Sequence, residues 1–175
     1  ASFAAAGAFS DGLALVRSAD SGYLVLDTEG KTVAALEAGA DPAYYTVYGG
    51  DTVVMTNGTN YALYSISKGA YLTDFLYNVV SEFHDGAAMV RQINRWGIID
   101  TKAKLLTNPT YYYLSYMGEG LYAARSEDGS VAAVDASGNI AYRTLTYIGG
   151  FNELRYGLSW HGMADGSLIF FKKNG

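Results

Sequence analysis

The sequence predicts an all-β protein of five repeats, each of about 35 residues, closed into a small ring like a β-propeller. Three observations predict this fold: one hairpin pattern recurs along the chain, its copies are nearly evenly spaced, and the composition suits short strands joined by tight turns. The chain has 175 residues, of which 21 are Gly, 16 are Tyr and only 2 are Pro. A linear β-solenoid or β-roll of stacked hairpins is the alternative architecture.

The hairpin pattern is clearest at residues 83–102. A turn at 85–86 precedes a short apolar strand at 87–91, a polar tip at 92–95 and a second apolar strand at 96–100. The same order recurs in four other segments, at residues 9–30, 48–65, 117–138 and 151–171. We therefore expect five hairpins in which one position is equivalent, occupied by Tyr23, Tyr61, Trp96, Val131 and Leu168.

The spacing of the copies predicts a single domain, 1–175, of repeat units. The aromatic residue or Met before each first turn is Phe9, Tyr48, Phe83, Met117 and Phe151, at intervals of 39, 35, 34 and 34 residues. The residues after Phe151, added to those before Phe9, make about one further period. The units are thus approximately 9–47, 48–82, 83–116, 117–150, and 151–175 plus 1–8.

Two further short strands complete each unit. One follows each hairpin, at 32–36, 71–75, 104–107 and 140–145, and one precedes the next hairpin, at 44–48, 77–83, 111–116 and 144–151. Four strands per unit are typical of a propeller blade. Residues 1–8 would then complete the sheet begun by 155–172 and close the ring, and the absence of a polar cap at either end favours closure over a solenoid.

The repeated unit resembles the WG repeat of bacterial proteins. That pattern has an aromatic residue, Asp or Glu followed by Gly, a strand of small apolar residues, and then Trp-Gly, two aliphatic residues and Asp. Residues 83–100 carry all of these features, with Trp96 and Gly97 as the signature pair, and the other units carry the pattern without the pair. The resemblance implies a β-repeat module and supplies no catalytic residues.

Composition excludes several classes of function. The net charge is −5 and Lys and Arg do not cluster, so a nucleic-acid interface is not expected. No apolar segment approaches the roughly 20 residues that a membrane-spanning helix needs. The chain has no Cys, which removes disulfides, thiol nucleophiles and thiolate metal sites. A secreted or cell-envelope setting is favoured over a cytoplasmic one.

The titratable residues do not predict an active site, a metal site or a cofactor. His84 and His161 fall at non-equivalent places in different units. Acidic residues repeat in one column, Asp27, Asp100 and Asp135, and Arg17, Arg91 and Arg125 repeat in another. Residues repeated in register more often hold turns or link strands than catalyse a reaction, and the turns at 27–30 and 135–138 offer too few oxygens for calcium. We expect no enzyme, and a hydrolase is the least favoured alternative.

Tyrosines give the best candidate binding surface. Tyr44, Tyr113 and Tyr147 lie four residues before the aromatic or Met that marks each unit. If their rings face solvent, they can stack on sugars or dock a peptide, because Tyr offers contact area with a polar end. If they are buried between units, the chain is a structural spacer in a larger protein. The sequence favours a non-enzymatic module whose partner is a protein surface or a glycan.

Overall fold

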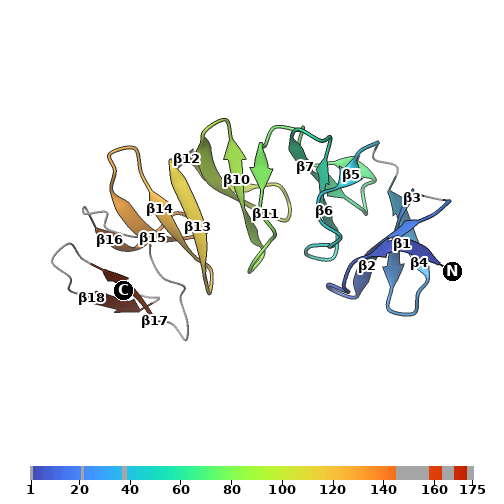
Figure 1. Cartoon of the computed structure of the whole chain (residues 1–175), viewed down its shortest axis with the longest axis horizontal. Coiled ribbons are helices and arrows are strands. Elements are labelled where there is room, and N and C mark those ends of the chain that lie inside the picture. Colours follow the sequence, from blue (N-terminus) through green and yellow to red (C-terminus); the bar gives the residue numbers. More distant parts are fainter. Residues whose placement is uncertain (1, 21, 37–38, 145–157, 163–167, 173–175) are drawn as a thin grey trace. The chain divides into compact units, whose positions relative to one another are not determined.

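The computed structural model confirms the all-β prediction (Figure 1). It describes residues 2–20, 22–36, 39–144, 158–162 and 168–172, and within these residues no helix is present. The chain divides into two compact units. Unit 1 is Ala1–Gly86 with Thr101–Lys104, and unit 2 is Ala87–Asp100 with Leu105–Gly175. The prediction of one domain stays a prediction, as does the closure of the ring.

Unit 1 contains two antiparallel sheets of four strands, each strand paired with the next along the chain. The first sheet is β1 (Phe3–Ala6), β2 (Leu13–Ser18), β3 (Gly22–Asp27) and β4 (Thr32–Leu36). The second sheet is β5 (Asp41–Pro42), β6 (Thr52–Thr56), β7 (Tyr61–Ser65) and β8 (Ala70–Tyr71). The remaining strand of unit 1 is β9 (Val79–Val80). A meander of this kind needs only short connections, so each sheet closes locally.

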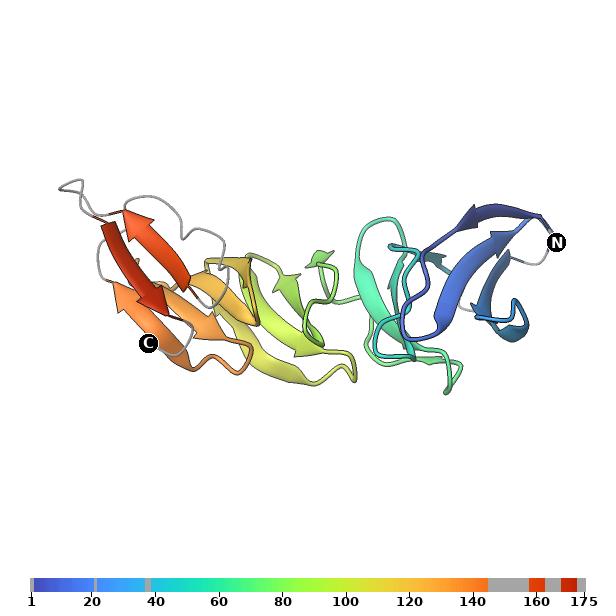
Figure 2. The same cartoon turned by 90° about the horizontal axis from the view of Figure 1, so that it is seen from below.

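Unit 2 repeats the meander (Figure 2). Its first strands are β10 (Ala87–Gln92), β11 (Arg95–Asp100) and β12 (Leu105–Tyr111), with β11 in the middle. A sheet of four follows, β13 (Tyr113–Gly118), β14 (Leu121–Arg125), β15 (Val131–Asp135) and β16 (Ile140–Thr144). The last described pair is β17 (Leu158–Gly162) and β18 (Leu168–Lys172). Of the predicted strands after the hairpins, 32–36 and 140–145 match β4 and β16, whereas 104–107 overlaps β12 in part and 71–75 overlaps β8 only at Tyr71. The predicted strand 44–48 is wrong, because the strand at this place is β5. The predicted strand 144–151 lies mostly outside the described residues.

The pairing of the first strand corrects one expectation. Residues 1–8 were expected to complete the last sheet, beside 155–172. Instead β1 pairs with β2, with Phe3 opposite Ser18 and Ala6 opposite Val16. The reason is local: β1 and β2 are joined by a tight turn in which the Ser10 and Leu13 backbones bond to each other at 2.9 Å, and closing so short a loop sacrifices little chain entropy.

Strand register confirms the predicted equivalence of the five hairpin positions. Each lies opposite the fifth residue of the first hairpin strand, in the pairs Arg17–Tyr23, Thr56–Tyr61, Arg91–Trp96, Arg125–Val131 and Gly162–Leu168. Two residues further along are Val25, Leu63, Ile98 and Ala133, each with 0% of its surface exposed. Strand alternation puts these positions on the same face as the repeated column. In four of the five hairpins the repeat is therefore a repeat of core positions, whereas Phe170, at the equivalent place in the last hairpin, is 61% exposed.

Gly97 has a physical reason to follow Trp96. A Cβ at this position would lie 2.6 Å from the Thr107 carbonyl oxygen and 2.8 Å from the Pro109 nitrogen, both backbone atoms of β12. The pairing of β11 with β12 is irregular at this point, between Trp96 and Ile98. Only glycine lets the two backbones approach this closely.

Each unit has its own apolar core. In unit 1 the main cluster is Leu15, Val25, Val47, Val53, Met55 and Tyr64. In unit 2 one cluster is Ala87, Ile98, Leu114, Tyr122, Ala124, Ala132 and Val134, and another is Met117, Leu121, Ala123 and Ala133. The described part of the structure has no helix that could span a membrane.

Candidate functional site: the tip surface of unit 2

Two of the three predicted tyrosines lie in different environments. Tyr113 begins β13 and is 49% exposed. Tyr44 is half-buried, and its hydroxyl donates a hydrogen bond to the Val80 carbonyl oxygen at 2.8 Å. Burial, together with the nearby Tyr61 and Glu82, raises the pKa of Tyr44. Tyr147 lies outside the described residues. Of the two described tyrosines, only Tyr113 therefore has a ring available for a partner.

The register explains why the tyrosine column does not hold in three dimensions. Tyr113 lies opposite Arg125, and the residue at the corresponding place in the second sheet is Asp41, opposite Thr56. Along the chain, Tyr48 follows Asp41 at a distance three residues longer than that at which Met117 follows Tyr113. Counting back from the marker thus compares Tyr113 with a residue of a loop.

Two of the three repeated acidic residues, Asp27 and Asp135, hold turns, as the sequence suggested. Asp27 Oδ1 accepts hydrogen bonds from the Glu29 and Lys31 backbone N–H groups at 3.0 and 2.9 Å. Asp135 Oδ1 accepts the same bonds, from Ser137 and Asn139, at 2.8 and 2.9 Å. Side-chain-to-backbone bonds of this type stabilise tight turns. Among the described residues, no three His, Asp or Glu side chains form a group suited to a metal ion.

The second sheet of unit 1 makes the same turn with different side chains. Ser65 occupies the place of Asp27 and Asp135, and its hydroxyl donates to Asp51 Oδ2 at 2.6 Å. The Ser67 N–H donates to Asp51 Oδ1 at 2.6 Å. Burial alone would raise the pKa of Asp51, but the bonds from Ser65 and Ser67 outweigh it and hold this pKa below its usual value. Asp51 also borders a pocket of about 280 Å³ that Lys68 and Lys102 line, but its carboxylate is already engaged by the turn.

Two of the three repeated arginines lie against aromatic rings of the neighbouring strand, and the third, Arg125, lies opposite Val131. The Arg17 guanidinium carbon is 5.8 Å from the Tyr23 ring centre, and that of Arg91 is 5.5 Å from the Trp96 ring centre. Both pairs are directly opposite in their hairpins. The arginine column thus contributes cross-strand contacts, which agrees with its expected structural role.

A different group of residues forms the most exposed apolar and cationic feature of unit 2, which we call the tip surface. It consists of Ile93, Arg95, Tyr112, Tyr113 and Glu127. Ile93 is 77% exposed and has a backbone φ of 57°. A β-branched residue in the left-handed region is strained, and such strain concentrates at functional sites.

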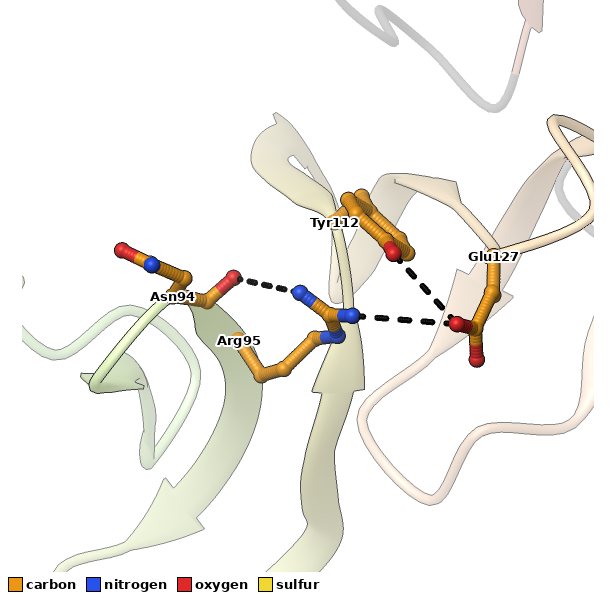
Figure 3. A network of polar contacts seen from close by, with 4 residues as sticks. All are labelled: Asn94, Arg95, Tyr112 and Glu127. Carbon is orange, nitrogen blue, oxygen red and sulfur yellow. Dashed lines mark hydrogen bonds and ion pairs between the residues drawn. The ribbon is translucent and has the colours of Figure 1, made fainter.

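Arg95 is the centre of the tip surface (Figure 3). Its guanidinium carbon lies only 3.6 Å from the centre of the Tyr112 ring. Nη1 donates to the Asn94 carbonyl oxygen at 3.3 Å, and Nη2 lies 3.9 Å from Glu127 Oε1. The Tyr112 hydroxyl donates to the same Glu127 oxygen at 3.4 Å. The guanidinium therefore has a fixed orientation.

Tyr112 owes its position to two strand pairings. At the end of β12, Tyr111 lies opposite Trp96, so the next residue, Tyr112, comes beside Arg95. The Tyr112 N–H bonds to the Arg125 carbonyl oxygen at 2.8 Å, which brings its ring toward Glu127 in the tip between β14 and β15. Tyr112, which lies between β12 and β13 in the chain, therefore contacts both Arg95 and Glu127.

Two hollows border this network. One of about 430 Å³ is lined by Gln92, Ile93, Asn94, Arg95 and Pro109. The other, of about 440 Å³, is lined by Tyr112, Arg125, Ser126, Glu127 and Gly129. Tyr112 itself is 40% exposed. The tip surface thus offers an aliphatic side chain, aromatic rings and oriented charge at one place.

Sequence reasoning found Tyr113 but missed Ile93, Arg95, Tyr112 and Glu127. The tips were treated as polar connections, and Tyr112 was separated from Tyr113 only by strand alternation. One signal was present: the other described tips carry Gly22, Gly58 and Gly129 at positive φ, and the tip at 92–95 has no glycine. An isoleucine where a tight tip favours Gly is unusual.

Comparison with a protein family supports the repeat. Residues 96–129 match the WG containing repeat. The match spans one period, from the Trp96-Gly97 pair to the tip that holds Glu127, and it includes Tyr112 and Tyr113. The predicted resemblance is confirmed over this segment. No curated protein matches the chain in sequence.

Solved β-propellers match the structure. Kluyveromyces lactis Hsv2 is 10% identical, with a TM-score of 0.51, over 95% of this chain and 61% of its own. Hsv2 from Kluyvelomyces marxianus is 13% identical, with a TM-score of 0.52, over 97% of this chain and 63% of its own. The WD40 β-propeller domain of Doa1 matches with 14% identity and a TM-score of 0.35, over 94% and 58%.

These likenesses concern the fold alone, because the sequence identities are low. The two Hsv2 structures confirm that the meanders are propeller-like. The chain spans about 60% of the length of the solved propellers that it matches.

Proposed function

We propose that the chain is a non-enzymatic interaction module that binds a protein segment through the tip surface. One observation carries the proposal: Ile93 is strained and 77% exposed, beside an arginine stacked on Tyr112. The backbone strain at Ile93 opposes folding, so a function that uses the side chain accounts for its presence.

The composition of the tip surface favours a protein partner. Tyr and Arg are the residues in which protein interfaces are enriched and from which their energetic hot spots are built. The rings of Tyr112 and Tyr113 supply contact area with few rotatable bonds, and the guanidinium of Arg95 is held in place before a partner arrives. The hollows on both sides would receive side chains of the partner.

Two other functions are less well supported. A glycan would also use exposed tyrosines, but it would not account for an exposed isoleucine. A hydrolase would need a converging set of titratable groups, and the acidic residues of the closing turns at 27 and 135 are engaged by backbone N–H groups. A purely structural spacer would not need a strained apolar residue at a tip.

Selection from a displayed library of random twelve-residue peptides tests the proposal. Enriched peptides are synthesised with a fluorophore, and their affinities are measured by fluorescence polarisation. We expect Ile93→Ser and Tyr112→Ala each to weaken binding about tenfold or more, as hot-spot residues do. Ile140→Ser is the matched control, because Ile140 is 49% exposed in the same unit but lies on β16, and its effect should stay within about twofold.

The proposal is wrong if no peptide is enriched, or if the enriched peptides bind both tip variants as well as the unaltered protein. A glycan array run in parallel separates the remaining alternative. Glycan binding that depends on Tyr112 but not on Ile93 would replace the protein partner with a sugar.

A further inference from the structure

Resting on the proposed function, we infer that the partner segment presents a carboxylate next to an aliphatic side chain. The carboxylate pairs with Arg95, and the aliphatic side chain enters the hollow beside Ile93. Glu127 holds the place of the partner's carboxylate in the free protein.

Arg95 is prepared to receive a carboxylate. The Tyr112 ring lies against one face of the guanidinium, and the Asn94 carbonyl oxygen accepts from Nη1. These contacts hold the planar fork in one orientation while leaving 33% of the side chain exposed. A guanidinium pairs best with a carboxylate through two parallel hydrogen bonds, and an oriented fork loses little freedom when they form.

Glu127 is a weak internal partner for this guanidinium. Its Oε1 is 3.9 Å from Nη2, well beyond the roughly 2.7–2.9 Å of a strong charge-assisted hydrogen bond. The Glu127 side chain is 80% exposed, and ion pairs between exposed side chains contribute little. A carboxylate that approaches closely can therefore displace it.

The apolar part of the partner is placed by the hollow that Arg95 shares with Ile93 and Pro109. Because one hollow borders both the aliphatic side chain and the guanidinium, the partner's aliphatic group and carboxylate belong to the same residue or to neighbouring residues. A second arginine, Arg125, lines the other hollow with Glu127.

The local charges favour an acidic partner. The charged residues that line the two hollows are Arg95, Arg125 and Glu127. Asp128 lies next to Glu127, and its Oδ1 accepts from the Ser130 N–H at 2.9 Å in the turn. Unit 2 as a whole carries no net charge, whereas unit 1 carries the net −5 of the chain. The net charge therefore repels an acidic segment from unit 1 but not from unit 2.

A pair of small probes tests the inference without knowledge of the partner. N-acetyl-leucine carries an isobutyl group and a carboxylate, and N-acetyl-leucinamide carries the same group without the charge. Each is titrated into the full chain labelled with ¹⁵N-arginine, and the side-chain Nε–H signals of Arg95 are followed by NMR. We expect N-acetyl-leucine to shift the Arg95 signal in a saturable way and to bind about tenfold or more tighter than the amide.

Three variants sharpen the test. Arg95→Gln should abolish the difference in affinity between the two probes, which is then followed from the backbone amide of Ile93 in uniformly ¹⁵N-labelled protein. Glu127→Gln should strengthen binding of N-acetyl-leucine about two- to fivefold, because the competing carboxylate is gone; a Glu127 that served only to hold the structure would not give tighter binding. Arg17→Gln is the matched control, because Arg17 also lies against a tyrosine but in unit 1, and it should leave binding unchanged.

Equal affinity for the two probes, or unchanged or weaker binding by Glu127→Gln, would overturn the inference. If both probes bind equally and selected peptides still depend on Ile93 and Tyr112, the interaction function stands and only the acidic partner is wrong. If neither a probe nor a peptide depends on these residues, both ideas fail.

Discussion

The closing turns and the tips lie at opposite ends of the same hairpins, and their side chains have different roles. At the closing turns, the carboxylates of Asp27 and Asp135 accept hydrogen bonds from backbone N–H groups of the turn. In the second sheet, Asp51 accepts hydrogen bonds from the Ser65 hydroxyl and the Ser67 N–H. The hydrogen bonds are repeated although the residues are not always the same. The side chains at these turns therefore stabilise the fold.

The tips are less uniform. Gly22, Gly58 and Gly129 adopt positive φ without strain, whereas Ile93 adopts it with a β-branched side chain. The tips therefore differ from one hairpin to the next, and the exception coincides with the Arg95–Tyr112 network. Positions that repeat from hairpin to hairpin support the fold. A strained position that departs from the repeat, such as Ile93, is a candidate for function.

Gly97→Ala should give the largest loss of stability. The new methyl group would overlap backbone atoms of Thr107, Asn108 and Pro109, which cannot move aside as a side chain can. We expect the free energy of unfolding to fall by about 3 kcal/mol or more, measured by urea denaturation with tryptophan fluorescence. Both tryptophans, Trp96 and Trp160, lie in unit 2. A change below about 1 kcal/mol would show that β11 and β12 can separate without loss.

Asp135→Ala tests the closing turn. The substitution removes three hydrogen bonds, from the Ser137 and Asn139 backbone N–H groups and the Asn139 side chain. We expect a loss of about 1–2 kcal/mol in the same denaturation experiment. Asp128→Ala, in the tip of the same hairpin, is the control, because it removes a bond from the Ser130 N–H at the other end of the hairpin. An equal effect of the two substitutions would contradict the contrast between turns and tips.

Ile93→Gly should stabilise the protein, in contrast to the two substitutions above. Glycine adopts positive φ without the strain that isoleucine bears, so the free energy of unfolding should rise by about 1 kcal/mol. Binding of peptides at the tip surface should weaken at the same time. Ile93→Val keeps both the strain and most of the apolar surface, and both readouts should change little. A destabilised Ile93→Gly would mean that this side chain supports the fold.

The smallest expected effect is a pH dependence at Asp51. Its pKa is lower in the folded protein than in the unfolded chain, so its contribution to stability is present above the unfolded value of about 3.9. That contribution is lost as the pH falls through the lowered pKa. The Ser67 amide, which donates to Asp51, should exchange its hydrogen faster at acidic pH relative to the intrinsic rate, and Asp51→Asn should remove this dependence. A Ser67 amide equally protected in both proteins would show that the bond is dispensable.

The predicted elements were accurate because hairpins are local. β10 and β11 each exceed the predicted strands 87–91 and 96–100 by one residue, and β2, β3, β6, β7, β14 and β15 lie within the predicted hairpin segments. Alternation of apolar residues and turn chemistry act between residues close in the chain, so the sequence displays them directly. The role of the repeated acidic residues followed from the same logic.

The sequence by itself determined the all-β class, the period and the hairpins, because these depend on contacts within one repeat. Only the tertiary structure decided that β1 joins the first sheet, that Tyr44 and Tyr113 are not equivalent, and that Tyr112 meets Arg95 and Glu127. The last of these depends on where β12 ends against β11 and where the next sheet begins. Three extra residues in a loop, or one irregular pairing, change which side chains meet, and neither leaves a periodic trace in the sequence.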